Sequence, residues 1–103
     1  MNKVYVITDI VHSGRKGIRG ERVTEEKYVG LIGIRVNLDI DNIQPYKTIK
    51  MNLLDHHPYY NWWTTSIVIA SIAEDDKVEI ETANTIYRLT EWKSNKEEKE
   101  AGD

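Results

Sequence analysis

Short runs in which apolar and polar side chains alternate, separated by clusters of turn-forming residues, recur along this chain. Alternation with a period of two is typical of a β-strand that turns one face toward a core. The composition agrees, because 13 Ile, 8 Val and 8 Thr stand against only 4 Ala and 5 Leu. β-Branched side chains favour strands, whereas a helical domain is usually rich in Ala and Leu. The sequence therefore predicts an all-β protein.

The alternation predicts about six strands. The last two are expected to form a hairpin, because Asn84 between them tolerates the positive φ of a tight turn. The fourth is apolar on both faces from Ile67 to Ala70, which predicts the central strand of the sheet or a subunit contact. The predicted strands cover residues 3–11, 28–38, 48–53, 62–73, 77–82 and 85–92.

These strands predict a small curled antiparallel sheet or a barrel of the SH3-like or OB-like type, since closure removes exposed sheet edges. The segment Gly30–Val36 contains glycines at 30 and 33, where a bulge or sharp bend is expected. This segment is similar to the glycine-kinked second strand of SH3-like barrels, and the resemblance implies the same architecture.

The length bounds the organisation of the chain. With 103 residues it can bury one core but not two, so residues 1–92 are predicted to form a single domain. Residues 93–103 contain seven charged side chains and no large apolar one, which predicts a disordered or weakly helical tail. The chain has no cysteine and no apolar run of the ~20 residues that cross a bilayer, so a cytoplasmic protein without a membrane partner is expected. The high Ile and low Ala content indicates an AT-rich genome, such as that of a low-GC bacterium or its phage.

A basic loop, residues 12–22, combines three glycines with four cationic side chains. Exposed backbone N–H groups beside cations suit phosphate groups, although a solvated loop has the same composition. The pattern matches neither a Walker loop nor a dinucleotide-binding fingerprint. An overall charge of −3 argues against a general nucleic-acid coat, so any such contact is expected to be local. The predicted phosphate contacts are Arg15, Lys16, Arg19 and Arg22.

An aromatic loop, residues 55–63, holds two His, two Tyr and two Trp. Exposed Tyr and Trp stack on bases or anchor partners, whereas buried ones fill a core. Because the chain has no Phe, alternation is expected to turn one of Trp62 and Trp63 inward. The predicted ligand contacts in this loop are His56, His57, Tyr59, Tyr60 and Trp63.

The residues of the same loop also bear on metal binding and catalysis. Asp55, His56 and His57, with His12, lack the spacing of a recognisable zinc site, so no metal and no cofactor is predicted. A small hydrolase using His56 or His57 is a third possibility, but the nearby hydroxyl residues carry no nucleophile motif.

The sequence leaves two functions open. The first is a non-enzymatic module that binds an anionic ligand, a nucleic acid or a nucleotide-like molecule, through the basic loop and the aromatic loop. The alternative is a protein-interaction subunit, such as a phage or mobile-element accessory protein, that self-associates through residues 62–72.

Overall fold

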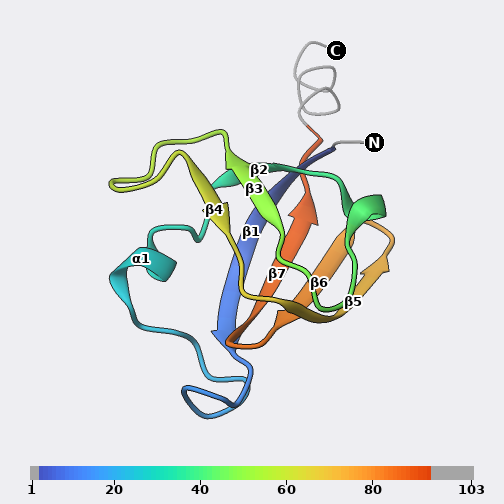
Figure 1. Cartoon of the computed structure of the whole chain (residues 1–103). Coiled ribbons are helices and arrows are strands. Elements are labelled where there is room, and N and C mark those ends of the chain that lie inside the picture. Colours follow the sequence, from blue (N-terminus) through green and yellow to red (C-terminus); the bar gives the residue numbers. More distant parts are fainter. Residues whose placement is uncertain (1–2, 94–103) are drawn as a thin grey trace.

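The computed structural model describes residues 3–93, which form an all-β structure around one seven-stranded antiparallel sheet (Figure 1). The spatial order of the strands is β4-β3-β2-β1-β7-β6-β5. All but Lys93 of the predicted tail lies outside the described residues. The elements are β1 (Lys3–His12), α1 (Glu26–Val29), β2 (Arg35–Leu38), the 3₁₀ turn η1 (Ile40–Asn42), β3 (Lys50–Leu53), β4 (Trp62–Thr64), β5 (Val68–Glu74), β6 (Lys77–Thr82) and β7 (Thr85–Glu91).

The sheet is curled but not closed. Strands β1 to β4 follow one another from its centre to one edge, and β5 to β7 return from the other edge to β1. Residues 65–67 carry the chain from β4 to β5. The Tyr46 N–H donates to the Val68 carbonyl at 2.7 Å, and the Val68 N–H donates to the Lys47 carbonyl at 2.9 Å. These bonds draw the start of β5 against the segment before β3. The predicted antiparallel sheet is confirmed, and it has the curled form rather than that of a closed barrel.

The core lies inside the curl and draws on both halves of the sheet. Strand β1 contributes Tyr5 and Ile7, and after a β-bulge between Ile7 and Asp9 it also buries Ile10. A bulge adds one residue and reverses which face the following side chains occupy. Further fully buried side chains are Leu31, Val36, Met51, Val68, Ile80, Tyr87 and Leu89.

The predicted strand over residues 28–38 is wrong in its first half. Residues 26–29 form the single helical turn α1, and the chain turns again before β2. The Gly30 N–H donates to the Glu26 carbonyl and the Ile34 N–H to that of Leu31, while Gly33 adopts a φ of +89° that glycine favours. Only the end of the Gly30–Val36 segment is extended, so the expected resemblance to an SH3-like second strand does not hold for most of it. Among residues 3–93, no helix is long and apolar enough to cross a membrane.

The predicted central strand over residues 62–73 is also wrong. It is divided into β4 and β5, which lie at opposite edges of the sheet. The break falls at Thr65, whose side chain donates to the Ser66 carbonyl at 2.7 Å and accepts from the Ile49 N–H at 3.1 Å. A hydroxyl that bonds local backbone groups competes with a regular strand. The expected hairpin of β6 and β7 is confirmed, with Glu81 opposite Ile86.

Candidate ligand-binding cleft

The basic loop and the aromatic loop meet at one cleft with a volume of about 430 Å³. Lys16 reaches it from the first loop, and Tyr60 and Trp62 reach it from the second and from β4. In Figure 1, α1 lies between the two loops on the same side of the molecule. The cleft is lined by Lys16, Lys27, Tyr28, Tyr60, Trp62, Trp63, Thr64, Thr65, Ser66, Asn84 and Tyr87.

The inner wall of the cleft is a cluster of aromatic rings around Trp63. This side chain is only 7% exposed, and its indole N–H donates to the Tyr87 hydroxyl oxygen at 2.8 Å. The rings of Tyr28 and Tyr60 stand edge-on to Trp63, with centroid distances of 5.3 and 5.2 Å. Edge-to-face contacts of this kind hold rings in fixed orientations. The wall is therefore set by core packing.

At the rim of the cleft Trp62 and Tyr28 each lie close to a lysine; Lys27 lines the cleft and Lys50 does not. Trp62 is 52% exposed, and the Lys50 ammonium lies 4.9 Å from its ring centroid. The Lys27 ammonium lies 5.4 Å from the centroid of Tyr28, whose pKa is raised by burial and by the Glu25 carboxylate. Trp62, rather than the predicted Trp63, is thus the indole available for stacking.

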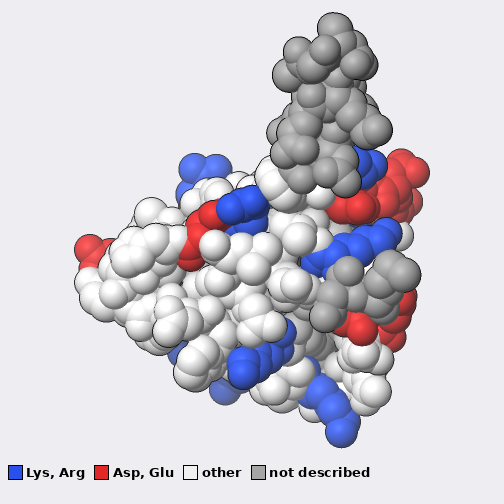
Figure 2. Space-filling model, turned by 90° about the horizontal axis from the view of Figure 1, so that it is seen from above, with Lys and Arg blue, Asp and Glu red and all other residues white. Residues whose placement is uncertain are grey.

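The four predicted cations of the basic loop differ in their surroundings. Arg19 forms two bonds with the Glu81 carboxylate, at 2.8 and 3.0 Å, and these bonds hold the pKa of Glu81 below its usual value. Arg22 pairs with Asp9 at 3.0 Å. Arg15 and Lys16 are exposed, and only Lys16 lines the cleft. In the view of Figure 2, basic side chains lie at several separate places.

Two adjacent histidines of the aromatic loop have opposite environments. His56 is exposed, whereas His57 is buried, with its Nε2 atom 3.1 Å from the Lys27 carbonyl. The His57 Nδ1 atom accepts from the Tyr59 N–H at 3.1 Å, so Nε2 carries the proton and donates to Lys27. His57 therefore fastens the aromatic loop to α1, and both of its ring nitrogens are engaged by backbone.

Two further contacts hold the aromatic loop. The Asp55 carboxylate accepts from the Arg35 guanidinium at 2.8 Å and from the Arg35 backbone N–H at 2.8 Å, and these bonds lower the pKa of Asp55. The Tyr59 hydroxyl donates to Glu26 at 2.9 Å, which raises the pKa of Tyr59. Tyr59 is thus exposed but directed at α1. Among residues 3–93, no three His, Asp or Glu side chains are arranged to hold a metal ion.

The sequence does not predict the cleft residues that come from α1 and from the turn between β6 and β7. Tyr28 begins the predicted strand over residues 28–38 and Lys27 directly precedes it, and nothing in their spacing relates them to the aromatic loop. The Asn84 side-chain amide donates to the Ser66 hydroxyl at 2.8 Å, whereas the sequence predicts only a turn at Asn84. Comparison with protein-family models, curated proteins and solved structures finds no match for this chain.

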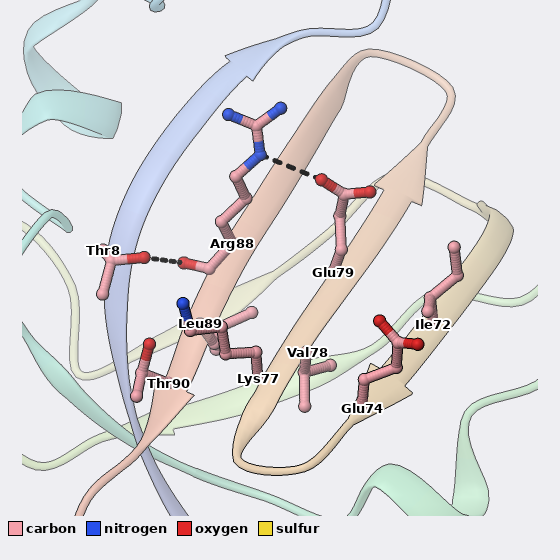
Figure 3. A pocket seen from close by; sticks show the side chains of 9 residues that line it. All are labelled: Thr8, Ile72, Glu74, Lys77, Val78, Glu79, Arg88, Leu89 and Thr90. Carbon is pink, nitrogen blue, oxygen red and sulfur yellow. Dashed lines mark hydrogen bonds and ion pairs between the residues drawn. The ribbon is translucent and has the colours of Figure 1, made fainter.

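A second hollow, of about 360 Å³, lies across β5, β6 and β7 (Figure 3). Two of its charged groups are paired with each other, because the Arg88 guanidinium donates to Glu79 at 2.9 Å. Thr8 closes one side by donating to the Arg88 carbonyl at 3.0 Å. None of the predicted ligand contacts lines this hollow.

The buried phenol of Tyr87 makes the protein sensitive to alkali. Burial is the main reason that the pKa of Tyr87 is raised from 10.0 to about 12. Because the folded-state pKa is the higher one, the stabilisation is complete below pH 10 and is lost as the pH rises toward 12. We expect about 2 to 3 kcal/mol of the free energy of unfolding to be lost over this interval. Urea unfolding between pH 9 and 12 measures it, and Tyr87→Phe should show a smaller decline than the unmodified protein.

Proposed function

We propose that this protein is a non-enzymatic binding module for a nucleotide-like ligand, with a planar ring and a phosphate group held in the cleft. The observation that carries the proposal is that Lys16 and Lys27, from separate segments, line the same cleft as the exposed Tyr60 and Trp62. Lysines supply charge for a phosphate, and Tyr and Trp supply flat surfaces on which a base stacks.

The cleft suits such a ligand in size and in polarity. A volume of about 430 Å³ falls within the roughly 300–1,000 Å³ range of small-molecule sites. Ser66 and Asn84 line the cleft and, bonded to each other at 2.8 Å, make part of its wall polar. Stacking is worth about 1 to 3 kcal/mol per base and does not depend strongly on which base is present.

A planar base and a phosphate group occur both in a free nucleotide and in single-stranded nucleic acid. One titration distinguishes these two ligands. Tryptophan fluorescence is followed while adenosine monophosphate, uridine monophosphate or a six-nucleotide oligonucleotide is added at about 50 and 200 mM salt. Binding is expected to weaken with salt because it depends on phosphate charge. An oligonucleotide that binds more than about tenfold tighter than both nucleotides would identify a strand as the ligand.

Two variants with a matched control test the cleft. Lys16→Ala is expected to weaken binding about three- to tenfold, and Trp62→Leu by about tenfold, as loss of stacking predicts. Arg15→Ala removes an exposed cation next to Lys16 that does not line the cleft, so it should have little effect. Equal weakening by Lys16→Ala and Arg15→Ala, or affinity that is unchanged by salt, would contradict the proposal.

The other function suggested by the sequence, self-association, depends on a different part of the molecule. The segment predicted to self-associate, residues 62–72, is divided between two strands. Strand β4 contributes to the cleft, and β5 does not.

A further inference from the structure

Strand β5 forms an edge of the sheet that carries apolar side chains into solvent. Within residues 3–93, β5 pairs with β6 on one side only, and on the other side Val68 bonds to residues 46 and 47. Ile69 and Ile72 are 45% and 59% exposed. Edge strands are usually protected by a charge, a proline or a covering segment, yet residues 67–73 contain no charged residue and no proline.

The direction of the backbone groups on this edge follows from the turn between β5 and β6. Glu74 and Lys77 are paired across a two-residue turn, in which the flanking residues bond to each other. The N–H and C=O groups of Glu74 therefore face β6. The direction of the backbone N–H and C=O groups alternates along a strand. Those of Ser71 and Ala73 therefore face the side of β5 that is away from β6.

We propose that a second copy of this chain binds this edge, with the two β5 strands antiparallel and related by a two-fold axis at Ile72. In this register Ser71 of each copy lies opposite Ala73 of the other, and each such pair exchanges two backbone hydrogen bonds. The two Ile72 residues then face each other as a non-hydrogen-bonded pair, with Cα atoms about 4.5 Å apart. Figure 3 shows Ile72 on β5 at the margin of the second hollow, the one across β5, β6 and β7, so the pairing extends that surface.

Charge complementarity at the two ends of the paired strands favours a second copy over another partner. In this register the β5–β6 turn of one copy lies toward the Val68 end of β5 in the other, beyond the β-bulge between Val68 and Ala70. Lys47 is exposed, and its carbonyl accepts from the Val68 N–H. The acidic turn formed by Glu74, Asp75 and Asp76 of each copy thus lies beside Lys47 of the other, twice in the dimer.

The contact is small, so the dimer is expected to depend on concentration. Pairing of two short edges lies below the 1,200–2,000 Å² typical of stable complexes, and a dissociation constant of roughly 10 to 100 µM is expected. Sedimentation velocity should therefore show the mass rise from 12.0 kDa toward about 24 kDa as the concentration increases. A protein that stays monomeric to about 1 mM would overturn the proposal.

Substitutions test the edge and its charges. Ile72→Lys introduces the charge that the edge lacks and should weaken dimerisation by more than tenfold. Ile18→Lys is the matched control, because Ile18 is 69% exposed on the basic loop, and it should leave the dimer intact. Lys47→Glu should weaken the dimer, and adding Asp76→Lys should restore it. Absence of that restoration, with both variants folded by circular dichroism, would contradict the register.

The absence of cysteine from the chain allows a direct test of the pairing. Ile72→Cys should form a disulfide-linked dimer under mild oxidation, because the expected Cα separation lies within the range of disulfides. Ala70→Cys, also exposed on β5, should not, because its counterpart lies four residues along the strand. Equal cross-linking of both variants would overturn the register. Since the cleft and the paired edge share no residue, failure of this proposal leaves the nucleotide titration unaffected.

Discussion

Replacement of Trp63 by alanine is expected to lower the free energy of unfolding by about 3 to 5 kcal/mol. The indole is 7% exposed, packs against two tyrosine rings and donates to the Tyr87 hydroxyl. Its removal leaves a cavity and takes a hydrogen bond from a buried phenol. Domains of this size are stable by only about 5 to 15 kcal/mol, so the variant should lose a large part of its stability.

The neighbouring residue supplies the control. Trp62 is 52% exposed, so Trp62→Ala should cost less than about 1 kcal/mol while removing the ring proposed to stack on the ligand. Urea unfolding followed by circular dichroism measures both variants without depending on tryptophan emission. If the two substitutions were equally destabilising, the assignment of Trp63 to the core and Trp62 to the rim would be incorrect.

The alternation along the chain is enough to predict the all-β class, because most of the strands pack one face on a common core. It cannot predict where a bulge changes the face. In β1, Ile7 and Ile10 are both buried although they are three residues apart, since the extra residue between them reverses the alternation. Strict alternation places these two side chains on opposite faces.

The prediction of one central strand over residues 62–73 fails for a different physical reason. An apolar run such as residues 67–70 is expected where both faces of a strand are buried, but the same run occurs where one chain meets another. Whether such a run is buried within the sheet or exposed at its edge depends on the neighbours of the strand. These neighbours are set by the connection at residues 65–67, which carries the chain from β4 at one edge to β5 at the other. Local pattern contains no information on that connection.

The cleft is predicted in part by the sequence. Composition marks both loops, and the structure brings Lys16 and Tyr60 to the same cleft. Trp63 also lines the cleft, and some of the other predicted contacts are bonded to partners distant in the sequence. Arg19 is paired with Glu81, 62 residues away, and His57 bonds to the carbonyl of residue 27. Only folding brings such partners together, so a local sequence pattern does not predict them.

His57 is expected to be the residue on which the shape of the cleft most depends. Its ring joins the aromatic loop to α1 through the Lys27 carbonyl and the Tyr59 N–H, and these two segments supply Lys27 and Tyr60 to the cleft. His57→Ala leaves both backbone groups without their partner and opens a cavity, so the free energy of unfolding should fall by about 2 to 4 kcal/mol.

The adjacent His56 is exposed, and His56→Ala should change stability by less than about 0.5 kcal/mol. If His57 acts by fastening the loop, His57→Ala should also weaken nucleotide binding at temperatures where the variant remains folded, whereas His56→Ala should not. Hydrogen exchange at Tyr59 and Tyr60 separates loss of the fastening from global unfolding. Exchange that accelerates at these amides in His57→Ala, while those of β1 remain protected, is the expected result. Equal acceleration throughout the sheet would instead show that His57 supports the whole fold, because a contact that only positions a loop changes local opening and leaves the core closed.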